Sequence, residues 1–528
     1  MGTYLNPGNN GFMRILKDYY VDKTGMIELI NDRMDSMSNL ICVSRPRRFG
    51  KSYAARMLCA YYDHTCDSHS LFDSLEISQT KHYNDHINAY NVVYLDIAGF
   101  VSDVMRRDGN IKGVVNEIVE AIRMDLIAEC PKLQEQKKLS KCMLEYVRST
   151  KTKFVFIIDE WDAVIREAKN NFEIQESYLN LLRGWFKNVN FTDEVVAAAY
   201  MTGILPIKKD KSQSAISDFD ECTVLEPGEF SIYTGFTEEE VKKLCYENNM
   251  SFDEAKQWYD GYSFFEVHSI YNPYSIMKAM KKRVFRSYWQ HTSAAENLET
   301  LININKDGLQ EDILKLIAGE QLVVNTNRFK NDFTSFSSKD DVLTLLIHLG
   351  YLVYDPNTKR VRIPNEEVRF EFDELLQNAQ HTQLASLISA SEHLFKDTLN
   401  GNEIAVAETI QRVRETNYAP MYYNNEQSLR YVIKFAYIVC IDYYLKVEEL
   451  PTGKGIADVV FIPKRDTSLP AMIVELKWNE SCESAIEQIK EKNYPAILAG
   501  YVGEMILVGI NYDEKTKDHS CDIEKIEL

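Results

Sequence analysis

Residues 39–62 read NLICVSRPRRFGKSYAARMLCAYY, and this stretch decides the fold of the N-terminal half. Residues 39–44 form a short apolar run of the kind found in buried strands, and Pro46 and Gly50 break the chain after it. From Lys51 onward, apolar residues recur at helical spacing. The stretch therefore predicts a strand, a tight loop and a helix.

The Gly-Lys-Ser triplet at the start of this helix predicts a phosphate-binding loop. Backbone N–H groups at a helix N-terminus bind phosphate, Lys51 can reach the β- and γ-phosphates, and the Ser52 hydroxyl can hold Mg²⁺. Arg45 stands where such a loop commonly has its first glycine, and Pro46 can provide a different bend there. A strand–helix turn that contains Gly-Lys-Ser by chance is the alternative.

An acidic motif further along the chain favours the phosphate-binding interpretation. Residues 154–158 form a continuous apolar run, typical of a buried parallel strand, which ends in Asp159 and Glu160. Such sheets bind ligands at the C-terminal ends of their strands, so Asp159 is predicted to hold Mg²⁺ and Glu160 to orient and deprotonate the attacking water. Further strands predicted at 91–99 and 194–205 complete a doubly wound parallel α/β sheet.

Composition limits the classes to which the protein can belong. The chain has 528 residues, 45% hydrophobic and 26% charged, which suits a globular protein of several domains. Its net charge of −19 excludes a surface built throughout to coat nucleic acid but leaves room for a local basic groove. Ten cysteines without a CxxC pair, and no secretory or membrane-spanning segment, predict a cytoplasmic protein with reduced thiols and no membrane partner. A zinc site at His64, Cys66 and His69 is disfavoured, because no second ligand pair lies nearby in the sequence.

Several ordered motifs resemble the AAA-like ATPases found in many bacterial genomes. They are SRPRRFGKS, FIIDEWD and YMTGILPI, with the earlier YYVDKTGMI and the later WYDGYSFF and YNPYSI, and the resemblance extends over residues 1–300. In that family the arginine-rich loop without its first glycine is the ordinary form. The resemblance implies ATP and Mg²⁺ as ligands. The nucleotide-binding residues that it implies are Arg47, Arg48, Gly50, Lys51, Ser52, Asp159 and Thr202.

The resemblance also distributes roles among these residues. Ser52 and Asp159 would hold the Mg²⁺, Glu160 would activate the water, and Thr202 would sense the γ-phosphate. Arg47 and Arg48 would act on the nucleotide or reach a neighbouring subunit of a homo-oligomer, and a solvated basic loop is the alternative. The sequence does not identify an arginine finger.

The middle of the chain, residues 236–380, is predicted to be helical and winged-helix-like. Residues 340–374 have the pattern of a helix followed by a β-hairpin. The helix has almost no basic residues, so we expect it to pack against the ATPase and not to enter a DNA groove. Lys359, Arg360 and Arg362 on the hairpin are the hint of phosphate contact in this region.

The C-terminal part holds a second set of acidic residues. After a helix predicted at 424–445, a Gly-rich turn leads into a strand with Asp458 near its start, and the next strand places Glu475 and Lys477 on one face. Two carboxylates on adjacent strands can hold Mg²⁺, and a lysine beside them can stabilise developing negative charge or position the water. A surface strand with a salt-bridged Glu and Lys is the alternative.

The motifs GIADVVF, MIVELKW, AIEQIKEKNY and ILVGINYD, over residues 420–515, resemble the PD-(D/E)xK nuclease superfamily. The resemblance implies a restriction-endonuclease-like α/β domain that uses Mg²⁺ or Mn²⁺. The residues that it brings in are Asp458 and Glu475 as metal ligands, Lys477 as the catalytic lysine, Gln488 as a contact to substrate or water, Tyr494 in the same motif, and Glu426 in the first helix. Ala457 stands where the family has its proline. Lys490 and Lys492 are phosphate-contact candidates, with a solvated helix face as an equal alternative.

Together these patterns predict three domains: an ATPase core at 1–235, a helical and winged-helix-like region at 236–380, and a helical lead-in with a nuclease-like domain at 381–528. The expected function is ATP hydrolysis coupled to metal-dependent cleavage of nucleic acid, DNA in preference to RNA. An ATP-dependent regulatory switch, whose nuclease-like fold binds nucleic acid or protein without cutting, is the alternative. The sequence does not settle the oligomeric state or whether ATP stimulates or restrains cleavage.

Overall fold

A computed structural model describes residues 2–168, 171–207, 216, 218–264, 267–289, 298, 300–303, 306–317, 319–329, 336–378, 383–417, 425–451, 456–464, 469–492 and 504–527. The chain divides into two compact units, one of residues 1–309 with 321–371 and one of residues 310–320 with 372–528. The predicted three-domain division at residues 235 and 380 stays a prediction. Among the described residues, no helix combines the length and the apolar character needed to cross a membrane.

A five-stranded parallel sheet lies at the centre of the first unit, with the strand order β2-β3-β4-β1-β5. Its strands are β1 (Leu40–Ser44), β2 (Asn91–Asp96), β3 (Phe154–Asp159), β4 (Val196–Gly203) and β5 (Asp220–Cys222). Strands β1, β3 and β4 are buried along their whole length, as expected of parallel strands that are covered on both faces.

The sheet contains the four strands predicted from the sequence, with two differences. Strand β2 ends at Asp96, because the Asp96 side chain accepts a hydrogen bond from the Gly99 N–H and caps the next helix. Strand β5 has only three residues, too few for a sequence pattern, and it forms by pairing with β1.

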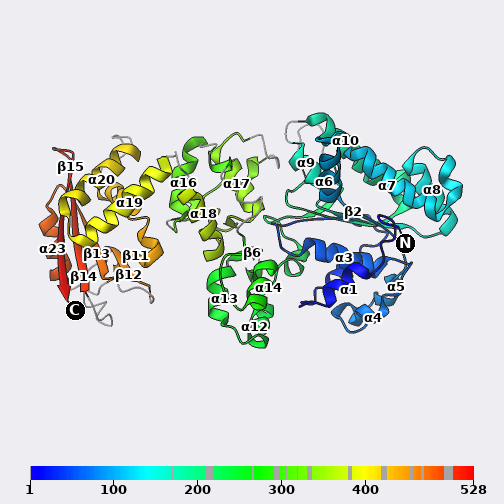
Figure 1. Ribbon diagram of the computed structural model, residues 1–528, viewed down its shortest axis with the longest axis horizontal. Helices are drawn as coiled ribbons and strands as arrows, with labels where there is room; N and C mark the ends of the chain where they lie inside the picture. Colours follow the sequence, from blue (N-terminus) through cyan, green and yellow to red (C-terminus); the bar gives the residue numbers. More distant parts are fainter. Residues whose placement is uncertain are drawn as a thin grey trace. The chain divides into compact units, whose positions relative to one another are not determined.

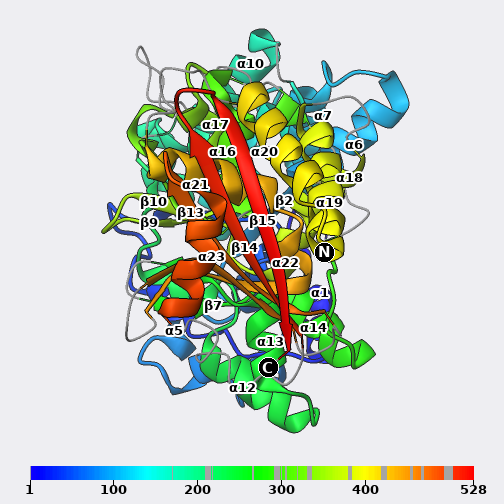
Figure 2. The same ribbon diagram turned by 90° about the vertical axis from the view of Figure 1, so that its left-hand side faces the viewer.

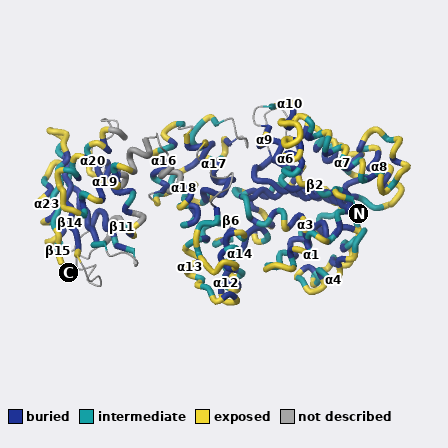
Figure 3. Tube along the Cα trace, viewed as in Figure 1, coloured by how far each residue is buried: buried dark blue, intermediate teal, exposed yellow. Residues whose placement is uncertain are grey.

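Helices cover both faces of this sheet, and Figure 1 shows them on its two sides. One face carries α1 (Asn10–Leu16), α2 (Met26–Asn31), α3 (Lys51–Tyr62), α4 (His69–Phe72) and α5 (Tyr83–His86). The other carries α6 (Ile97–Asp108), α7 (Val114–Glu129), α8 (Leu139–Thr150), α9 (Ala163–Glu167), α10 (Phe172–Phe186) and α11 (Val189–Val195). Each layer of helices encloses an apolar core, and the sheet between them is the most continuously buried part of the unit (Figure 3).

The rest of the first unit consists of short helices and small sheets. Its elements are α12 (Glu238–Glu247), α13 (Phe252–Tyr259), the hairpin β6 (Tyr262–Phe264) and β7 (Val267–Ile270), α14 (Pro273–Lys282), β8 (Leu322–Val323), α17 (Lys339–Leu349), β9 (Val353–Asp355) and β10 (Arg360–Arg362). The division between the units falls within α16 (Leu309–Ile317) and α18 (Glu366–Asn378).

The helix and hairpin predicted at 340–374 are present as α17, β9 and β10, and β8 pairs with β10 to complete a small antiparallel sheet. Helix α17 is buried from Asp341 to Leu349, so this part of it has no exposed face for a DNA groove. The Arg362 guanidinium donates hydrogen bonds to the carbonyl oxygens of Gly261 at 2.8 Å and Pro364 at 3.1 Å. Arg362 therefore anchors the hairpin within its own unit.

The second unit is built on a mixed sheet with the order β11-β12-β13-β14-β15, which faces the viewer in Figure 2. The strands are β11 (Tyr444–Pro451), β12 (Ile456–Pro463), β13 (Ala471–Trp478), β14 (Glu504–Asp513) and β15 (Asp518–Glu527), and only β13 and β14 run parallel among these pairs. Helix α23 (Cys482–Glu491) packs on one face, and α20 (Glu403–Asn417) packs along β15. The remaining helices are α19 (Gln383–Asn400), α21 (Glu426–Ala436) and α22 (Cys440–Tyr443).

The helix predicted over 424–445 is shorter than expected. It divides into α21 and α22, and β11 begins at Tyr444. Tyr444 pairs with Pro463 of β12, and its ring contacts Phe461. Pairing with a strand distant in the sequence therefore overrides the apolar helical pattern at this point.

Candidate nucleotide-binding and nuclease sites

The loop between β1 and α3 has the form that the sequence predicts. Gly50 adopts a φ of +85°, a left-handed conformation that favours glycine, and α3 begins at the next residue. The Lys51 Nζ donates hydrogen bonds to the carbonyl oxygens of Arg45 at 2.9 Å and Pro46 at 2.7 Å. Burial lowers the pKa of Lys51 to about 8. The lysine charge is thus held inside the loop, where phosphate oxygens would stabilise it.

Arg45, at the position of the missing glycine, has a structural role that the sequence did not reveal. Its side chain is fully buried and donates to the Thr234 hydroxyl at 3.0 Å and to the carbonyl oxygens of Cys222 at 2.7 Å and Pro227 at 2.9 Å. Its guanidinium carbon lies 4.7 Å from the centre of the Phe264 ring. Arg45 therefore ties the phosphate-binding loop to the chain segment that follows β5.

The predicted Mg²⁺ ligands of the nucleotide site lie side by side. The Ser52 side chain hydrogen bonds to the Asp159 carboxylate, which also accepts a hydrogen bond from Thr202 Oγ1 at 2.5 Å. Burial raises the pKa of Asp159, and these two hydrogen bonds oppose the shift. A hydroxyl beside a carboxylate fits Mg²⁺, which prefers oxygen ligands. Thr202 is buried in β4 and braces both acidic residues, because its Oγ1 also accepts from the Glu160 N–H at 3.2 Å.

The second acidic residue, Glu160, is paired with a cation that sequence reasoning missed. Glu160 Oε2 lies 2.6 Å from Nη2 of Arg166, whose Nε lies 3.2 Å from the buried Asp162 carboxylate. Burial alone would raise the pKa of Glu160, but Arg166 and Lys51 hold it below its ordinary value. Glu160 thus stays ionised, as a residue that accepts a proton from water requires. The one available signal was the spacing of Asp162 and Arg166, which are four residues apart.

Lys51, Ser52 and Glu160 border a cavity of about 710 Å³ within the first unit. Its polar side contains Arg47, Arg48, Gly50, Lys51, Ser52 and Glu160, and its other walls include Tyr19, Tyr20, Met57, Tyr274, Met277 and Trp289. Such a cavity can accommodate a charged phosphate chain at one end and an apolar ring system at the other.

The two loop arginines line this cavity in different surroundings. Arg48 Nη1 donates to the Tyr288 carbonyl oxygen at 2.7 Å, and its guanidinium lies 4.3 Å from the centre of the Tyr274 ring. Burial lowers the pKa of Arg47, and nearby Arg166 lowers it further. Arg47 therefore lies close to the acidic end of the site, and Arg48 links the loop to α14.

The second predicted site gathers its residues on the face of the second sheet that α23 covers. Asp458 lies on β12, Glu475 and Lys477 lie on the adjacent β13, and both carboxylates are buried. Gln488, on α23, bridges two of these residues. Its amide nitrogen donates to Glu475, and its carbonyl oxygen accepts from Lys477 Nζ at 2.6 Å.

Asp458 already has two partners, one of which the sequence did not indicate. Its Oδ2 accepts a hydrogen bond from the Leu476 N–H at 2.9 Å, and its Oδ1 forms an ion pair with Arg430 of α21. Burial and the neighbouring Asp458 raise the pKa of Glu475 to about 8. Glu475 Oε2 is buried and has no hydrogen-bond partner among the described residues. Two buried carboxylates on adjacent strands, one with an oxygen that lacks a partner, fit a divalent cation.

Two family models match the chain at these two sites. Residues 8–212 match a predicted AAA-ATPase family, and residues 424–520 match the PD-(D/E)XK nuclease superfamily. The chain combines an AAA-ATPase-like domain with a PD-(D/E)XK nuclease-superfamily domain. The two resemblances drawn from the sequence motifs are thereby confirmed, as is the α/β fold class of both parts.

Other proteins resemble the chain at lower similarity. An uncharacterised protein from the vnfD 5′ region of Azotobacter chroococcum mcd 1 is 22% identical over 516 residues, which cover 94% of each chain. Solved structures of Cdc6p from Pyrobaculum aerophilum and of the ORC2 protein from Aeropyrum pernix are 10% and 12% identical, and each covers 68% of this chain. They cover 94% and 96% of their own lengths. At TM-scores of 0.27 and 0.29, these two likenesses do not bear on fold or function.

The remaining predicted residues of the nuclease-superfamily domain are placed as follows. Lys492 lowers the pKa of Glu475 and so lies near the carboxylates, whereas Lys490 Nζ pairs with Glu524 at 2.5 Å. Burial and Asp458 raise the pKa of Glu426, which places Glu426 near the same site. Tyr494 lies outside the described residues.

The histidines and cysteines of the AAA-like domain form no further site at His64, Cys66 and His69. His64 Nε2 lies 2.9 Å from the Asn91 amide oxygen, and the Cys66 thiol donates to the Asp63 carbonyl oxygen at 3.5 Å. His69, in turn, pairs with Asp73. These partners explain the three side chains without a metal, and all ten cysteines are free thiols.

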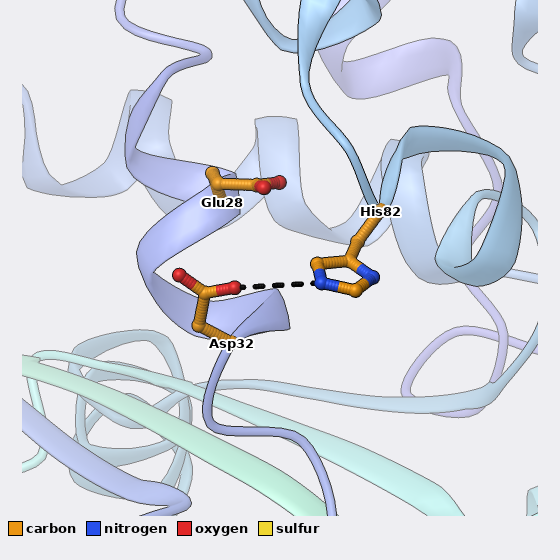
Figure 4. Close-up of side chains that lie close together, drawn as sticks. All are labelled: Glu28, Asp32 and His82. Carbon is orange, nitrogen blue, oxygen red and sulfur yellow. Dashed lines mark ion pairs between the residues drawn. The ribbon is translucent and has the colours of Figure 1, made fainter.

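Another cluster in the same domain contains Glu28, Asp32 and His82 (Figure 4). The His82 Nε2 lies 3.8 Å from the Asp32 carboxylate, and its Nδ1 lies 3.3 Å from the carboxylate of Asp85. Asp32 and Asp85 are exposed. The imidazole therefore lies between the exposed carboxylates of Asp32 and Asp85 at the surface of the domain.

Proposed function

We propose that the protein hydrolyses ATP in its AAA-like domain, cleaves DNA in its nuclease-superfamily domain with Mg²⁺ or Mn²⁺, and uses ATP to control that cleavage. The observation that carries the proposal is the convergence of Asp458, Glu475, Lys477 and Gln488 on one face of the second sheet. Gln488 hydrogen bonds to both Glu475 and Lys477, and Asp458 lies on the adjacent strand, which supports the assignment of these residues to one site. The ten free thiols support a cytoplasmic location.

In the AAA-like domain, Lys51 and the backbone N–H groups after Gly50 would bind the phosphates of ATP. Ser52 and Asp159 would hold Mg²⁺, which neutralises charge on the phosphates. Glu160, kept ionised by Arg166, would accept a proton from the attacking water. Thr202 would transmit the arrangement of the phosphates to Asp159 and Glu160, to which it bonds.

In the nuclease-superfamily domain, Asp458 and Glu475 would hold a divalent metal, which polarises the phosphodiester and helps to ionise water. Lys477 would place its charge beside the oxygen on which negative charge develops. Gln488 orients Lys477 and Glu475 toward each other through its amide. The proposed substrate contact of Gln488 would require one of these two hydrogen bonds to open.

One observation favours the alternative of a switch that does not cut. Arg430 forms an ion pair with Asp458, so a cation already neutralises one of the two proposed metal ligands. If Arg430 stays in place, the domain would bind its partner in response to ATP without cleaving it. The two functions differ in a single measurable respect, which is whether phosphodiester bonds break.

The test is incubation of the purified protein with plasmid, linear DNA and RNA, with Mg²⁺ or Mn²⁺, and with or without ATP. We expect the wild type to cleave DNA and Asp458→Ala and Glu475→Gln to lose this cleavage. Lys477→Ala should still bind the metal but cleave DNA slowly. The control is Glu487→Gln, an exposed neighbour on α23 that should cut like the wild type. Cleavage that persists in Asp458→Ala would point to a contaminant. A wild type that is inert on every substrate would support the switch.

The ATPase half is tested separately by calorimetry and turnover. Lys51→Ala should bind ATP markedly more weakly, because the paired charge at the phosphates is gone. Glu160→Gln should bind ATP and lose turnover. Lys132→Ala, which removes an exposed cation outside the cavity, is the control. Equal affinity of Lys51→Ala and the wild type would refute the phosphate-binding loop.

A further inference from the structure

A short segment of the first unit, after the AAA-ATPase match ends at residue 212, is strongly basic in an otherwise acidic protein. Residues 267–289 contain no Asp or Glu, while the whole chain has a net charge of −19. The segment carries five cations, Lys278, Lys281, Lys282, Arg283 and Arg286, which we call the basic cluster. Because the background is acidic, a local excess of this kind needs a reason.

Helix α14 positions the basic cluster at the surface. The Asn272 side chain caps the helix by accepting from the N–H groups of Tyr274 and Ser275. The apolar side of α14, with Ile276, Ala279 and Met280, is buried in a core with α12 and α13. Lys281, Lys282, Arg283 and Arg286 are exposed, whereas Lys278 is half-buried and lines the nucleotide cavity together with Lys281.

In the part of the chain that the structure describes, one cation of the cluster has a carboxylate partner. Lys281 pairs with Asp18 at 2.8 Å. Within the described residues, the other four cations have no carboxylate at ion-pair distance, whereas exposed arginines elsewhere do: Arg107 pairs with Asp108 and Glu117, and Arg148 with Glu194. Cations favour the last turn of a helix, but Arg283 and Arg286 lie beyond the end of α14, so that effect does not explain them.

Two tyrosines lie among these cations. Lys278 Nζ lies 5.3 Å from the Tyr274 ring centre, and the Arg286 guanidinium lies 5.3 Å from that of Tyr288. Tyr274 is 39% exposed. Tyr274 and Lys278 line the nucleotide cavity, whereas Tyr288 and Arg286 do not. Clustered cations suit a nucleic acid, because they meet its closely spaced phosphates.

We propose that the basic cluster binds the phosphate backbone of DNA, an inference that rests on the proposed function for the kind of nucleic acid. A polyanion supplies closely spaced phosphates to Lys282, Arg283 and Arg286, which are exposed and have no carboxylate partner among the described residues, and the same chain carries a nuclease-superfamily domain. An acidic protein surface, including that of a second copy of this chain, is the competing occupant. The cluster thus provides a local basic surface, which the acidic net charge of the whole chain does not exclude.

The test uses the full chain with Glu475→Gln, which prevents cleavage, and a fluorescent duplex and single strand of DNA over a range of NaCl concentrations. The triple variant Lys282→Glu/Arg283→Glu/Arg286→Glu should lose at least about tenfold in affinity, and the slope of log Kobs against log[NaCl] should become shallower by about two to three. None of these three residues lines the nucleotide cavity, so ATP turnover without DNA should stay unchanged and report an intact fold.

The matched control is Lys132→Glu/Lys137→Glu/Lys138→Glu, which changes the net charge equally at three exposed cations elsewhere. It should bind DNA like the parent. Equal losses in both triple variants, or wild-type affinity in the cluster variant, would overturn the inference. If the glutamate variant does not fold, the milder Lys282→Ala/Arg283→Ala/Arg286→Ala variant replaces it, and its DNA affinity should also fall.

The remaining outcomes separate this inference from the proposed function. Binding that depends on the cluster in a protein that never cleaves would support the inference and overturn the proposed cleavage. A cluster variant that cleaves DNA and binds it as tightly as the parent would overturn the inference and support the proposed cleavage. If the cluster variant instead changes the molar mass measured by light scattering and leaves DNA affinity unchanged, the occupant is a second copy of the chain and the inference fails.

Discussion

The carboxylate of Glu160 lies 2.6 Å from the guanidinium of Arg166, in an ion pair where the arginine side chain is only 9% exposed. Glu160 follows the last residue of β3, and Arg166 lies on α9, so the pair joins the end of the central sheet to a helix above it. Arg166 also contacts the Asp162 carboxylate, whose oxygen accepts from the N–H groups of Ile204 and Leu205. The proposed general base is thus held by a network anchored in the backbone after β4.

Replacing Arg166 by Ala should impair ATP turnover more than ATP binding. The carboxylate of Glu160 would lose its fixed position, and we expect kcat to fall by about tenfold to a hundredfold with little change in ATP affinity. The pKa of Glu160 would rise, because Arg166 now lowers it. The acidic limb of the pH profile of kcat should therefore move to higher pH. A smaller kcat with an unmoved acidic limb would show that Arg166 acts on the fold and not on Glu160, and Arg166→Lys should recover part of the rate.

Replacing Arg45 by Gly, the residue common in such loops, should destabilise the protein. The change leaves buried carbonyl oxygens of Cys222 and Pro227 without their donor, so we expect a loss of about 3 kcal/mol in the free energy of unfolding. Urea unfolding measures it. Arg106→Ala, which removes an arginine from an exposed ion pair, should cost no more than about 0.5 kcal/mol. Equal stability of Arg45→Gly and the wild type would mean that the loop does not need this anchor.

Replacing Arg430 by Ala should tighten metal binding at the nuclease-superfamily site. Arg430 competes with a divalent cation for Asp458, so its removal should raise Mn²⁺ affinity several-fold by calorimetry. The double variant Arg430→Ala/Asp458→Ala should lose this gain. Weaker Mn²⁺ binding by Arg430→Ala would show that the arginine organises the carboxylates and does not compete for them.

Glu367 should make the stability of the first unit depend on pH. Burial raises its pKa to about 8, although the Tyr288 N–H donates to it at 2.8 Å. Between the ordinary glutamate range and pH 8 the folded state holds a proton that the unfolded state has lost. Stability should therefore fall as the pH rises, by up to about 1.4 kcal/mol per pH unit.

Urea unfolding at pH 6 and pH 8 tests this expectation. Glu367→Gln keeps the acceptor oxygen and should make the pH dependence smaller, while Glu475, whose pKa is also raised to about 8, keeps its own contribution. The neighbouring Glu366→Gln changes a more exposed carboxylate and should keep it. The same pH dependence in wild type and Glu367→Gln would assign the effect to another group.

Much of the two sites can be predicted from residues that are close together in the sequence. Gly50, Lys51 and Ser52 are adjacent in the sequence, and Asp159 and Glu160 follow an apolar run that forms a strand in a buried sheet. Glu475 and Lys477 share a face because side chains alternate along a strand. These features can be predicted from the sequence because each depends on a backbone period, a glycine turn or the composition of one strand.

Several partners in and around these sites lie far away in the sequence and meet only in the folded chain. The hydrogen bond from Arg45 to the Cys222 carbonyl joins residues 177 positions apart, and the one from Arg430 to Asp458 joins residues 28 apart. Burial, which shifts the pKa values of Lys51 and Glu475, depends on every element packed around them. No local pattern encodes such contacts, because their energy comes from desolvation and pairing between segments that meet only when the chain is folded.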